Sequence, residues 1–230
     1  KMEEQTVFIP QSDEKEVETD LVIIGGGPAG LVIASVAAQL GLKVTLIEKS
    51  DKLGGDCLHT GCVPSKTLIH AAKVAALMRR GREFGLEAVE PKVDLGRVND
   101  HVQSVIDQIQ QHDDPERFRA YGCEVLFGRA HFIDAHQMEV MRPGSAPEVL
   151  RADAFVIATG SRPYHPPDVD FDHPRVLDSD TVLDLDQTPG SLTIYGAGVI
   201  GCEYASIFCH LDVKVNLVNT RDRLLSFLDD

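Results

Sequence analysis

The sequence predicts an α/β protein built on a parallel sheet with a small antiparallel meander, and a second unit of the same kind has begun where the sequence stops. Two observations support this fold class. Residues 19–24 (TDLVII) form an apolar run, followed at once by GGGPAG, an Ala-rich apolar stretch and the run KVTLIE. Residues 191–218 repeat this order with SLTIYGAGVIG, CEYASIFCHLD and VKVNLV. Strand, glycine turn, helix and strand within about 30 residues form the Rossmann-like pattern of dinucleotide binding.

The remaining elements follow from periodicity and turn residues. The first helix, LVIASVAAQLG, is apolar throughout, which predicts that it is buried. Residues 66–80 form a helix with a basic end, and residues 98–111 form an amphipathic helix. Within residues 123–152, CEVLFG and QMEVM predict an antiparallel meander, and DAFVIATG predicts a further strand. Residues 162–190 are rich in Pro and Asp, which indicates a crossing segment.

The composition excludes several classes of partner. The 230 residues carry a formal net charge of −14, which argues against nucleic acid and anionic membrane surfaces. No apolar run approaches the roughly 20 residues of a membrane span. Residues 1–18 are acidic and mixed, so we interpret them as a flexible lead-in and not a signal peptide. We therefore expect a cytoplasmic protein that acts on small molecules. In a reducing cytosol a disulfide is more often catalytic than structural.

The first glycine turn carries a candidate cofactor site at Gly25, Gly27, Gly30 and Glu48. The first glycine permits the tight turn, the second lets the backbone approach a pyrophosphate, and the third allows close packing of helix on strand. The helix N-terminus offers N–H groups to the phosphates. Glu48 ends the second strand, where an acid can accept hydrogen bonds from ribose hydroxyls.

The second glycine turn repeats this spacing at Gly196, Gly198 and Gly201. Asn219 stands where a ribose-binding acid would be expected, and Arg221 and Arg223 follow it. Because an arginine there can accommodate a 2′-phosphate, these residues favour neither NADH nor NADPH as the nucleotide.

The segment GGDCLHTGCVPSK places Cys57 and Cys62 five positions apart between glycines. The nine histidines form no second ligand pair at zinc-site spacing, so we predict no metal. On a regular helix, residues five apart rise about 7.5 Å, beyond the roughly 4.4–6.8 Å that a disulfide spans, so a bond requires a distorted turn. A strained, accessible disulfide is easily reduced. Cys123, Cys202 and Cys209 lie in apolar contexts, and we expect them in the core.

Together, GGDCLHTGCVPSK, GGGPAG, VIATGSRP and GAGVIGCE resemble the class I pyridine nucleotide–disulfide oxidoreductases, which include lipoamide dehydrogenase, glutathione reductase and mercuric reductase. The resemblance covers residues 19–230. It implies an FAD enzyme that is a homodimer in the complete protein. It divides the chain into an FAD-binding domain over 19–161, a crossing over 162–190 and the start of an NAD(P)-binding domain over 191–230.

The resemblance also implies residue roles. Cys57 is the thiol that meets substrate, Cys62 lies near the flavin, and Lys66 lies near flavin N5, paired with Glu203. The remaining cofactor residues are expected to contact FAD or NAD(P)H: Gly25, Gly27, Gly30, Glu48, Lys49, Gly55, Thr159 and Gly160 on the FAD side, and Gly196, Gly198 and Gly201 on the nicotinamide side.

The implied activity is hydride transfer from NAD(P)H through FAD to a redox-active Cys57–Cys62 disulfide, which then reduces a disulfide or a soft metal ion. Val199 stands where glutathione reductases carry a tyrosine, which disfavours glutathione. Residues 155–230 are also similar to soluble pyridine nucleotide transhydrogenase, whose members typically lack the second cysteine. A transhydrogenase that passes hydride from NADH to NADP⁺ is therefore one alternative. A nucleotide-binding fragment without turnover is the other.

Overall fold

The computed structural model describes residues 17–225, which form two compact units. The first unit contains residues 17–53 and 113–159, and the second contains residues 54–112 and 160–225. The predicted lead-in lies almost wholly outside the described residues, and the domain boundaries given above stay predictions. Within residues 17–225, every helix is too short or too polar to cross a bilayer.

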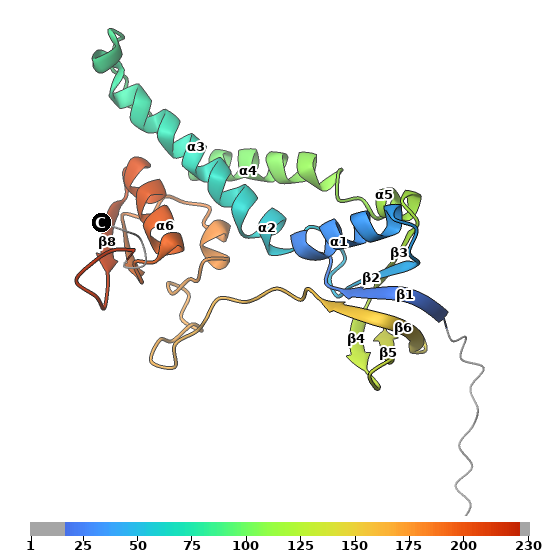
Figure 1. The fold of residues 1–230 in the computed structure, drawn as a ribbon. Helices are drawn as coiled ribbons and strands as arrows, with labels where there is room; N and C mark the ends of the chain where they lie inside the picture. The colour runs from blue at the N-terminus through green and yellow to red at the C-terminus, as the bar shows by residue number, and fades with distance from the viewer. Residues whose placement is uncertain (1–16, 226–230) are drawn as a thin grey trace, which may run out of the picture. The chain divides into compact units, whose positions relative to one another are not determined.

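The first unit is a six-stranded, mostly parallel sheet, which confirms the predicted fold class (Figure 1). The strand order is β3-β2-β1-β6-β5-β4. The first four strands in this order are parallel, whereas β6, β5 and β4 pair antiparallel. The strands are β1 (Val17–Ile24), β2 (Val44–Glu48), β3 (Cys123–Phe127), β4 (Arg129–Phe132), β5 (Gln137–Met141) and β6 (Glu148–Ile157).

The predicted antiparallel meander is wrong at its first strand. β3 is the parallel outer strand next to β2, with Glu48 opposite Phe127. Helix α5 (Pro115–Ala120) directly precedes β3, so the chain enters β3 from the same end as it enters β1 and β2. Only β4, β5 and β6 form the meander.

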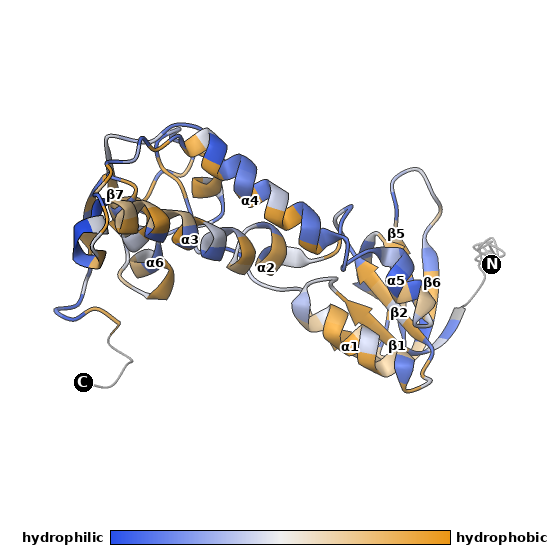
Figure 2. Ribbon diagram, turned by 90° about the horizontal axis from the view of Figure 1, so that it is seen from above, coloured by the Kyte–Doolittle hydropathy of each residue, from blue (hydrophilic) through white to orange (hydrophobic). Residues whose placement is uncertain are grey.

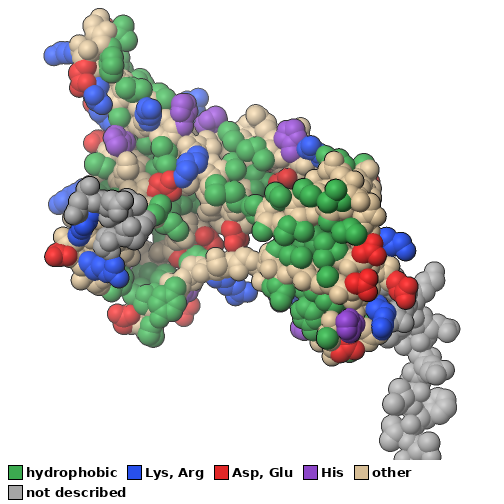
Figure 3. All heavy atoms as spheres, in the orientation of Figure 1, with side chains coloured by type: hydrophobic (Ala, Val, Ile, Leu, Met, Phe, Trp, Pro, Cys, Tyr) green, Lys and Arg blue, Asp and Glu red, His purple; other side chains and the backbone are tan. Residues whose placement is uncertain are grey.

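Strand β2 is buried along its whole length, and Val22 and Ile23 of β1 are buried as well, which explains the apolar sequences of these two strands. Ile23 and Leu46 pack under helix α1 (Pro28–Gln39), and Val22 packs on the opposite face. The prediction that α1 is buried is wrong for its outer face, where Val32 and Val36 are 64% and 53% exposed. Figure 3 shows hydrophobic side chains gathered over this helix.

The second unit is held together by helices. They are α2 (Gly55–His59), α3 (Cys62–Arg79), α4 (Leu95–Gln110) and α6 (Val199–His210), with the short 3₁₀ helices η1 (Gly81–Phe84) and η2 (Thr181–Asp184). Strands β7 (Ser191–Tyr195) and β8 (Lys214–Val218) pair in parallel. Leu68 of α3, Val102 of α4 and Ile207 of α6 share one core cluster. Figure 2 shows α4 with alternating hydrophilic and hydrophobic residues, as its predicted amphipathic pattern requires.

The crossing segment is anchored by Asp178. Burial of this carboxyl would raise its pKa, but hydrogen bonds from the Thr181 amide and hydroxyl, from His165 and from the Asp180 amide lower the pKa to about 2. These bonds organise the turn that leads into η2. The Pro- and Asp-rich composition predicted the irregular path, but not this anchor.

Candidate functional site

The first glycine turn is shaped by backbone that approaches too closely for any side chain. Gly25 has a φ of 110°, and a Cβ there would lie 2.2 Å from the Ala158 carbonyl oxygen. A Cβ on Gly30 would lie 1.9 Å from the Gly25 carbonyl oxygen. Gly27 is the N-cap of α1, so free N–H groups begin at this turn. The turn is an open backbone cradle of the kind that holds a pyrophosphate.

The Glu48 side chain is hydrogen-bonded to the backbone of this turn. Its carboxylate accepts hydrogen bonds from the Gly26 amide at 2.7 Å, the Ser50 amide at 2.8 Å and the Ser50 hydroxyl at 2.6 Å. Burial would raise the pKa of Glu48, but these bonds outweigh it and hold the pKa below the usual range. Gly26 and Ser50 were not among the predicted site residues. A serine two residues after a strand-ending acid was the available signal.

Strand β6 ends beside this turn, and Thr159 follows it. The Ala158 amide donates to the Ile24 carbonyl at 2.8 Å, and the Thr159 Cα lies 3.2 Å from the position of a Gly25 Cβ. Lys49 is exposed at the end of β2. The predicted residues Gly25, Gly27, Gly30, Glu48, Lys49 and Thr159 thus belong to one unit.

In the second unit, Cys57 and Cys62 lie on either side of a helix break. Cys57 belongs to α2, whereas Cys62 is the first residue of α3, which begins four residues before the predicted start. A Cβ on Gly61 would lie 2.9 Å from the Asp56 carbonyl oxygen and 3.4 Å from the Cys57 Cα. This close approach folds the start of α3 back against α2. The helical path is therefore broken between the two cysteines.

The glycines before the cysteines have a steric role of their own. Gly54 and Gly55 both adopt the left-handed conformation, with φ of 110° and 56°, which side chains disfavour. Gly160 also has a positive φ, and a Cβ there would lie 3.3 Å from an Asp56 carboxylate oxygen. Gly55 and Gly160 were predicted site residues, whereas Gly54 was not.

Helices α3 and α6 are joined by the ion pair between Lys66 and Glu203 that the resemblance implies. Lys66 lies one turn after Cys62, on the same face of α3. Next to Glu203, the Tyr204 hydroxyl donates to the Ser179 carbonyl at 2.9 Å. Burial, reinforced by nearby Asp180 and Glu203, raises the pKa of Tyr204 to about 12, so the phenol stays protonated and keeps this bond.

The second glycine turn repeats the close packing of the third glycine on the first, but a Cβ on Gly196 would meet nothing within 4 Å. Gly196 has a φ of 117°, and a Cβ on Gly201 would again lie 1.9 Å from the carbonyl oxygen of the first glycine. Gly198 is the N-cap of α6. Asn219 donates from Nδ2 to the Arg221 and Arg223 carbonyls, both at 3.0 Å, and so fixes the turn after β8.

The other cysteines differ from one another. Cys123 is buried, and burial raises its thiol pKa to about 11, so it is unreactive at neutral pH. Cys202 is half-buried under the second glycine turn. The prediction that Cys209 lies in the core is wrong, because it occupies the exposed face of α6. Within residues 17–225, no group of three or more His, Cys, Asp or Glu side chains is arranged to hold a metal ion.

Comparison with known proteins adds to this geometry. A family model described as pyridine nucleotide-disulphide oxidoreductase matches residues 19–230. The soluble pyridine nucleotide transhydrogenase of Vibrio cholerae serotype O1 is 47% identical over 211 residues, which are 92% of this chain and 45% of the relative. That of Marinomonas sp. is 48% identical over 212 residues, with the same shares. The chain thus spans about half the length of these relatives.

Solved structures are also similar. The HOCl-induced flavoprotein disulfide reductase RclA from Escherichia coli superimposes with a TM-score of 0.76 at 30% identity, over 92% of this chain and 44% of that one. A Cu(II) complex of the same protein gives the same values.

Proposed function

The chain belongs to the pyridine nucleotide-disulphide oxidoreductase family, and we therefore propose that the whole protein is an FAD-dependent oxidoreductase that uses NAD(P)H to reduce a disulfide. The observation that carries this proposal is the Gly61 break, which sets Cys57 and Cys62 on either side of a turn, one helical turn ahead of the Lys66–Glu203 pair. The proposed catalytic residues are Cys57, Cys62, Lys66 and Glu203.

The residues present fit two nucleotides. In each turn the third glycine packs too closely on the backbone of the first glycine for a Cβ to fit, and each turn begins a helix whose first N–H groups can receive a phosphate. We propose that the turn at Gly25 holds the ADP half of FAD and the turn at Gly196 holds NAD(P)H, with Glu48 orienting a ribose. When bound, FAD supplies electron-pair transfer between a nicotinamide and a second acceptor.

The chain's own thiols account for reduction of the substrate. The Cys57 thiolate attacks one sulfur of a substrate disulfide, so a Cys57–substrate bond forms and one substrate thiolate leaves. The Cys62 thiolate then attacks the Cys57 sulfur, which releases the second substrate thiolate and leaves a Cys57–Cys62 bond. Two protein thiols are oxidised and one substrate disulfide is reduced to two thiols, so atoms and electrons balance.

This exchange predicts that Cys62→Ser traps the reaction halfway. At Cys57, a prereduced Cys62→Ser chain mixed with a chromogenic aromatic disulfide should release one thiol and keep the other half of the reagent attached. The unsubstituted chain should rapidly release two. Thiol absorbance and intact-mass spectrometry followed by peptide mapping measure both outcomes.

Cys209→Ser is the matched control, because Cys209 is also exposed but lies outside the segment. It should leave the two-thiol release unchanged. Faster labelling of Cys209 than of Cys57, or full two-thiol release by Cys62→Ser, would contradict the exchange.

A second candidate function is supported by the 47–48% identity to soluble pyridine nucleotide transhydrogenases. In that case the protein transfers hydride from NADH to NADP⁺, and the cysteines are dispensable. Cys62→Ser in the whole flavin-loaded protein distinguishes the two functions. Disulfide reduction should fall by on the order of 10³-fold or more if the thiols carry it, whereas transhydrogenation should be unaffected.

The turn after β8 predicts that NADP(H) binds as well as NAD(H). Asn219 cannot repel a 2′-phosphate as a carboxylate would, and its two hydrogen bonds fix the backbone of Arg221 and Arg223. In calorimetric titrations, Arg221→Gln with Arg223→Gln should weaken binding of 2′,5′-ADP about tenfold or more and leave 5′-ADP unchanged. Lys214→Gln, an exposed cation on β8, is the control. Equal weakening of both nucleotides would count against this assignment.

We further propose that the whole protein is a cytoplasmic homodimer whose substrates are small molecules and not nucleic acid. The resemblance and the net charge of −14 support this. Sedimentation of the whole protein at several concentrations tests the dimer.

A further inference from the structure

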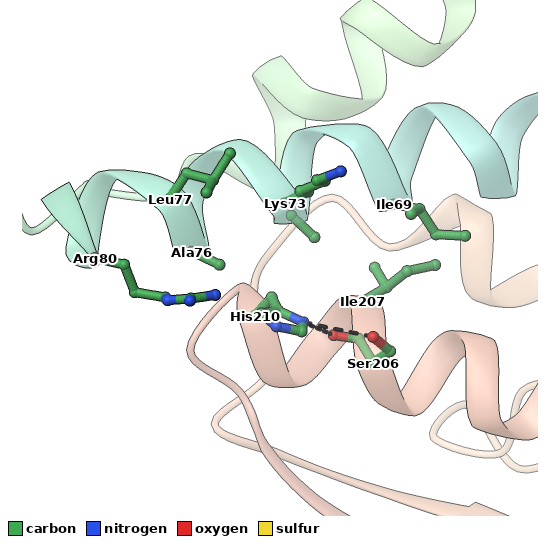
Figure 4. Close-up of a pocket in the computed structure, with 9 residues that line it drawn as sticks. Ile69, Lys73, Ala76, Leu77, Arg80, Ser206, Ile207 and His210 are labelled. Atoms are coloured by element: carbon green, nitrogen blue, oxygen red, sulfur yellow. Dashed lines mark hydrogen bonds between the residues drawn. The ribbon is translucent and has the colours of Figure 1, made fainter. Parts of the chain in front are cut away.

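A hollow lies between α3 and α6, lined by residues 69–80 and 206–210. The two helices are tied at one end by the Lys66–Glu203 pair and at the other by Arg79, whose Nη1 donates to the His210 carbonyl at 2.7 Å. Between these ties is a cavity of about 230 Å³. Figure 4 shows side chains from both helices around it.

The cavity has an apolar floor because small and aliphatic residues face each other there. Ala72 and Ala76 of α3 provide no bulk, and Ile69 and Ile207 line the space that they leave. The volume is below the roughly 300 Å³ of typical drug-sized sites, so an occupant must be a small molecule with a short apolar body.

The rim of the cavity is basic in a chain of net charge −14. Lys73, Arg80 and His210 line it, and no acidic side chain does. Arg80 is bound to Glu83, but Lys73 has no carboxylate partner in the described part of the chain. In Figure 4, Arg80 and His210 extend toward each other from the two helices.

Two unmet hydrogen-bonding groups lie at this end of the helices. The His210 Nδ1 lies 2.7 Å from the Ser206 carbonyl, so Nδ1 carries a proton, and Nε2 donates to a carboxylate only when the ring is doubly protonated. Nη2 of Arg79 is buried and has no acceptor among the described residues. A buried guanidinium N–H without an acceptor is costly, but Arg79 is not among the residues that line the cavity.

From the apolar floor and the basic rim, we propose that this hollow binds a small aliphatic carboxylate, with its chain against Ile69 and Ile207 and its carboxylate toward Lys73 and His210. The ligand would touch the helix that carries Cys62 and the helix that begins at the second glycine turn. The site is distinct from both predicted nucleotide sites, and its occupancy does not depend on the proposed function.

Isothermal titration with octanoate tests the proposal, with octylammonium as the charge-reversed probe and acetate as the probe without a chain. Octanoate should bind saturably, and the other two should not. Lys73→Gln should weaken octanoate binding about tenfold, since a charge-assisted hydrogen bond contributes that order of discrimination. Ala76→Phe fills the cavity and should abolish binding.

Lys92→Gln, an exposed lysine of the same unit outside the cavity, is the control and should bind octanoate normally. Circular dichroism checks that Ala76→Phe folds. If it does not fold, weaker octanoate binding by Lys73→Gln and His210→Gln decides the test. The proposal is overturned if octanoate does not saturate, if octylammonium binds equally well, or if Lys73→Gln binds octanoate as tightly as Lys92→Gln.

Discussion

Replacing Gly30 with alanine is expected to abolish flavin binding and to lower the free energy of unfolding by about 1–3 kcal/mol. The new Cβ would lie 1.9 Å from the Gly25 carbonyl oxygen and 3.3 Å from the Ile23 side chain. Gly25 cannot move aside easily, because its amide is bonded to the Ile47 carbonyl at 2.8 Å. Helix α1 must therefore shift away from β1, which opens the cradle. Flavin absorbance of the purified chain and urea denaturation measure the two effects.

Two further alanine substitutions make this test specific. Gly201→Ala meets the same 1.9 Å contact in the second turn, so it should weaken nicotinamide nucleotide binding and leave flavin binding intact. At Gly190 a Cβ would have open space, so Gly190→Ala should change neither. Retention of flavin by Gly30→Ala would show that the first turn does not hold the nucleotide. If the unsubstituted chain binds no flavin, the fragment interpretation gains support, and the stability effect still tests the packing.

Elements whose signal is local were predictable from the sequence. The apolar runs that became β1, β2, β7 and β8 are each followed or preceded by a glycine turn or helix at fixed spacing. The amphipathic helix was predicted three residues late, at residue 98. The cap that would have corrected this is Asp94, whose side chain accepts from the Arg97 amide at 3.2 Å.

Features that depend on distant residues were not predictable. The alternation of apolar and polar residues in CEVLF is the same for a meander strand and for a parallel outer strand. Only the pairing with β2 decides which of the two β3 becomes. The start of α3 at Cys62 depends on the contact of Gly61 with the backbone of Asp56, since Pro64 permits either start. The Tyr204–Ser179 bond joins segments that periodicity cannot relate.

The exposure of Cys209 shows the same limit within one helix. The run CEYASIFCHLD is apolar on several faces, so its composition predicts burial for both cysteines. In the structure, Tyr204, Ile207 and Phe208 take the buried face, and Cys209 follows them on the outside. Which face is buried depends on α3, and the sequence of α6 alone does not contain that information.

Glu48→Ala is also expected to lower the free energy of unfolding, by about 1–3 kcal/mol. The substitution leaves three donors without their acceptor: the Gly26 amide, the Ser50 amide and the Ser50 hydroxyl. A buried donor without a partner costs about 1–3 kcal/mol, and Gly26 is the buried one of the three. Glu48→Gln keeps the shape and one acceptor oxygen, so it should cost less. Urea denaturation at neutral pH measures both.

The same carboxylate predicts a pH dependence with a definite sign. Because the pKa of Glu48 is lower in the folded chain than its ordinary value of 4.5, the carboxylate stabilises the fold fully above that value and progressively less as pH falls through the folded pKa. The stability difference between the unsubstituted chain and Glu48→Gln should therefore narrow below about pH 4.5. Glu124→Gln, an exposed acid on neighbouring β3, should show no such narrowing. A gap between the unsubstituted chain and Glu48→Gln that stays constant down to pH 3 would show that shape, and not charge, is what the Gly26 amide recognises.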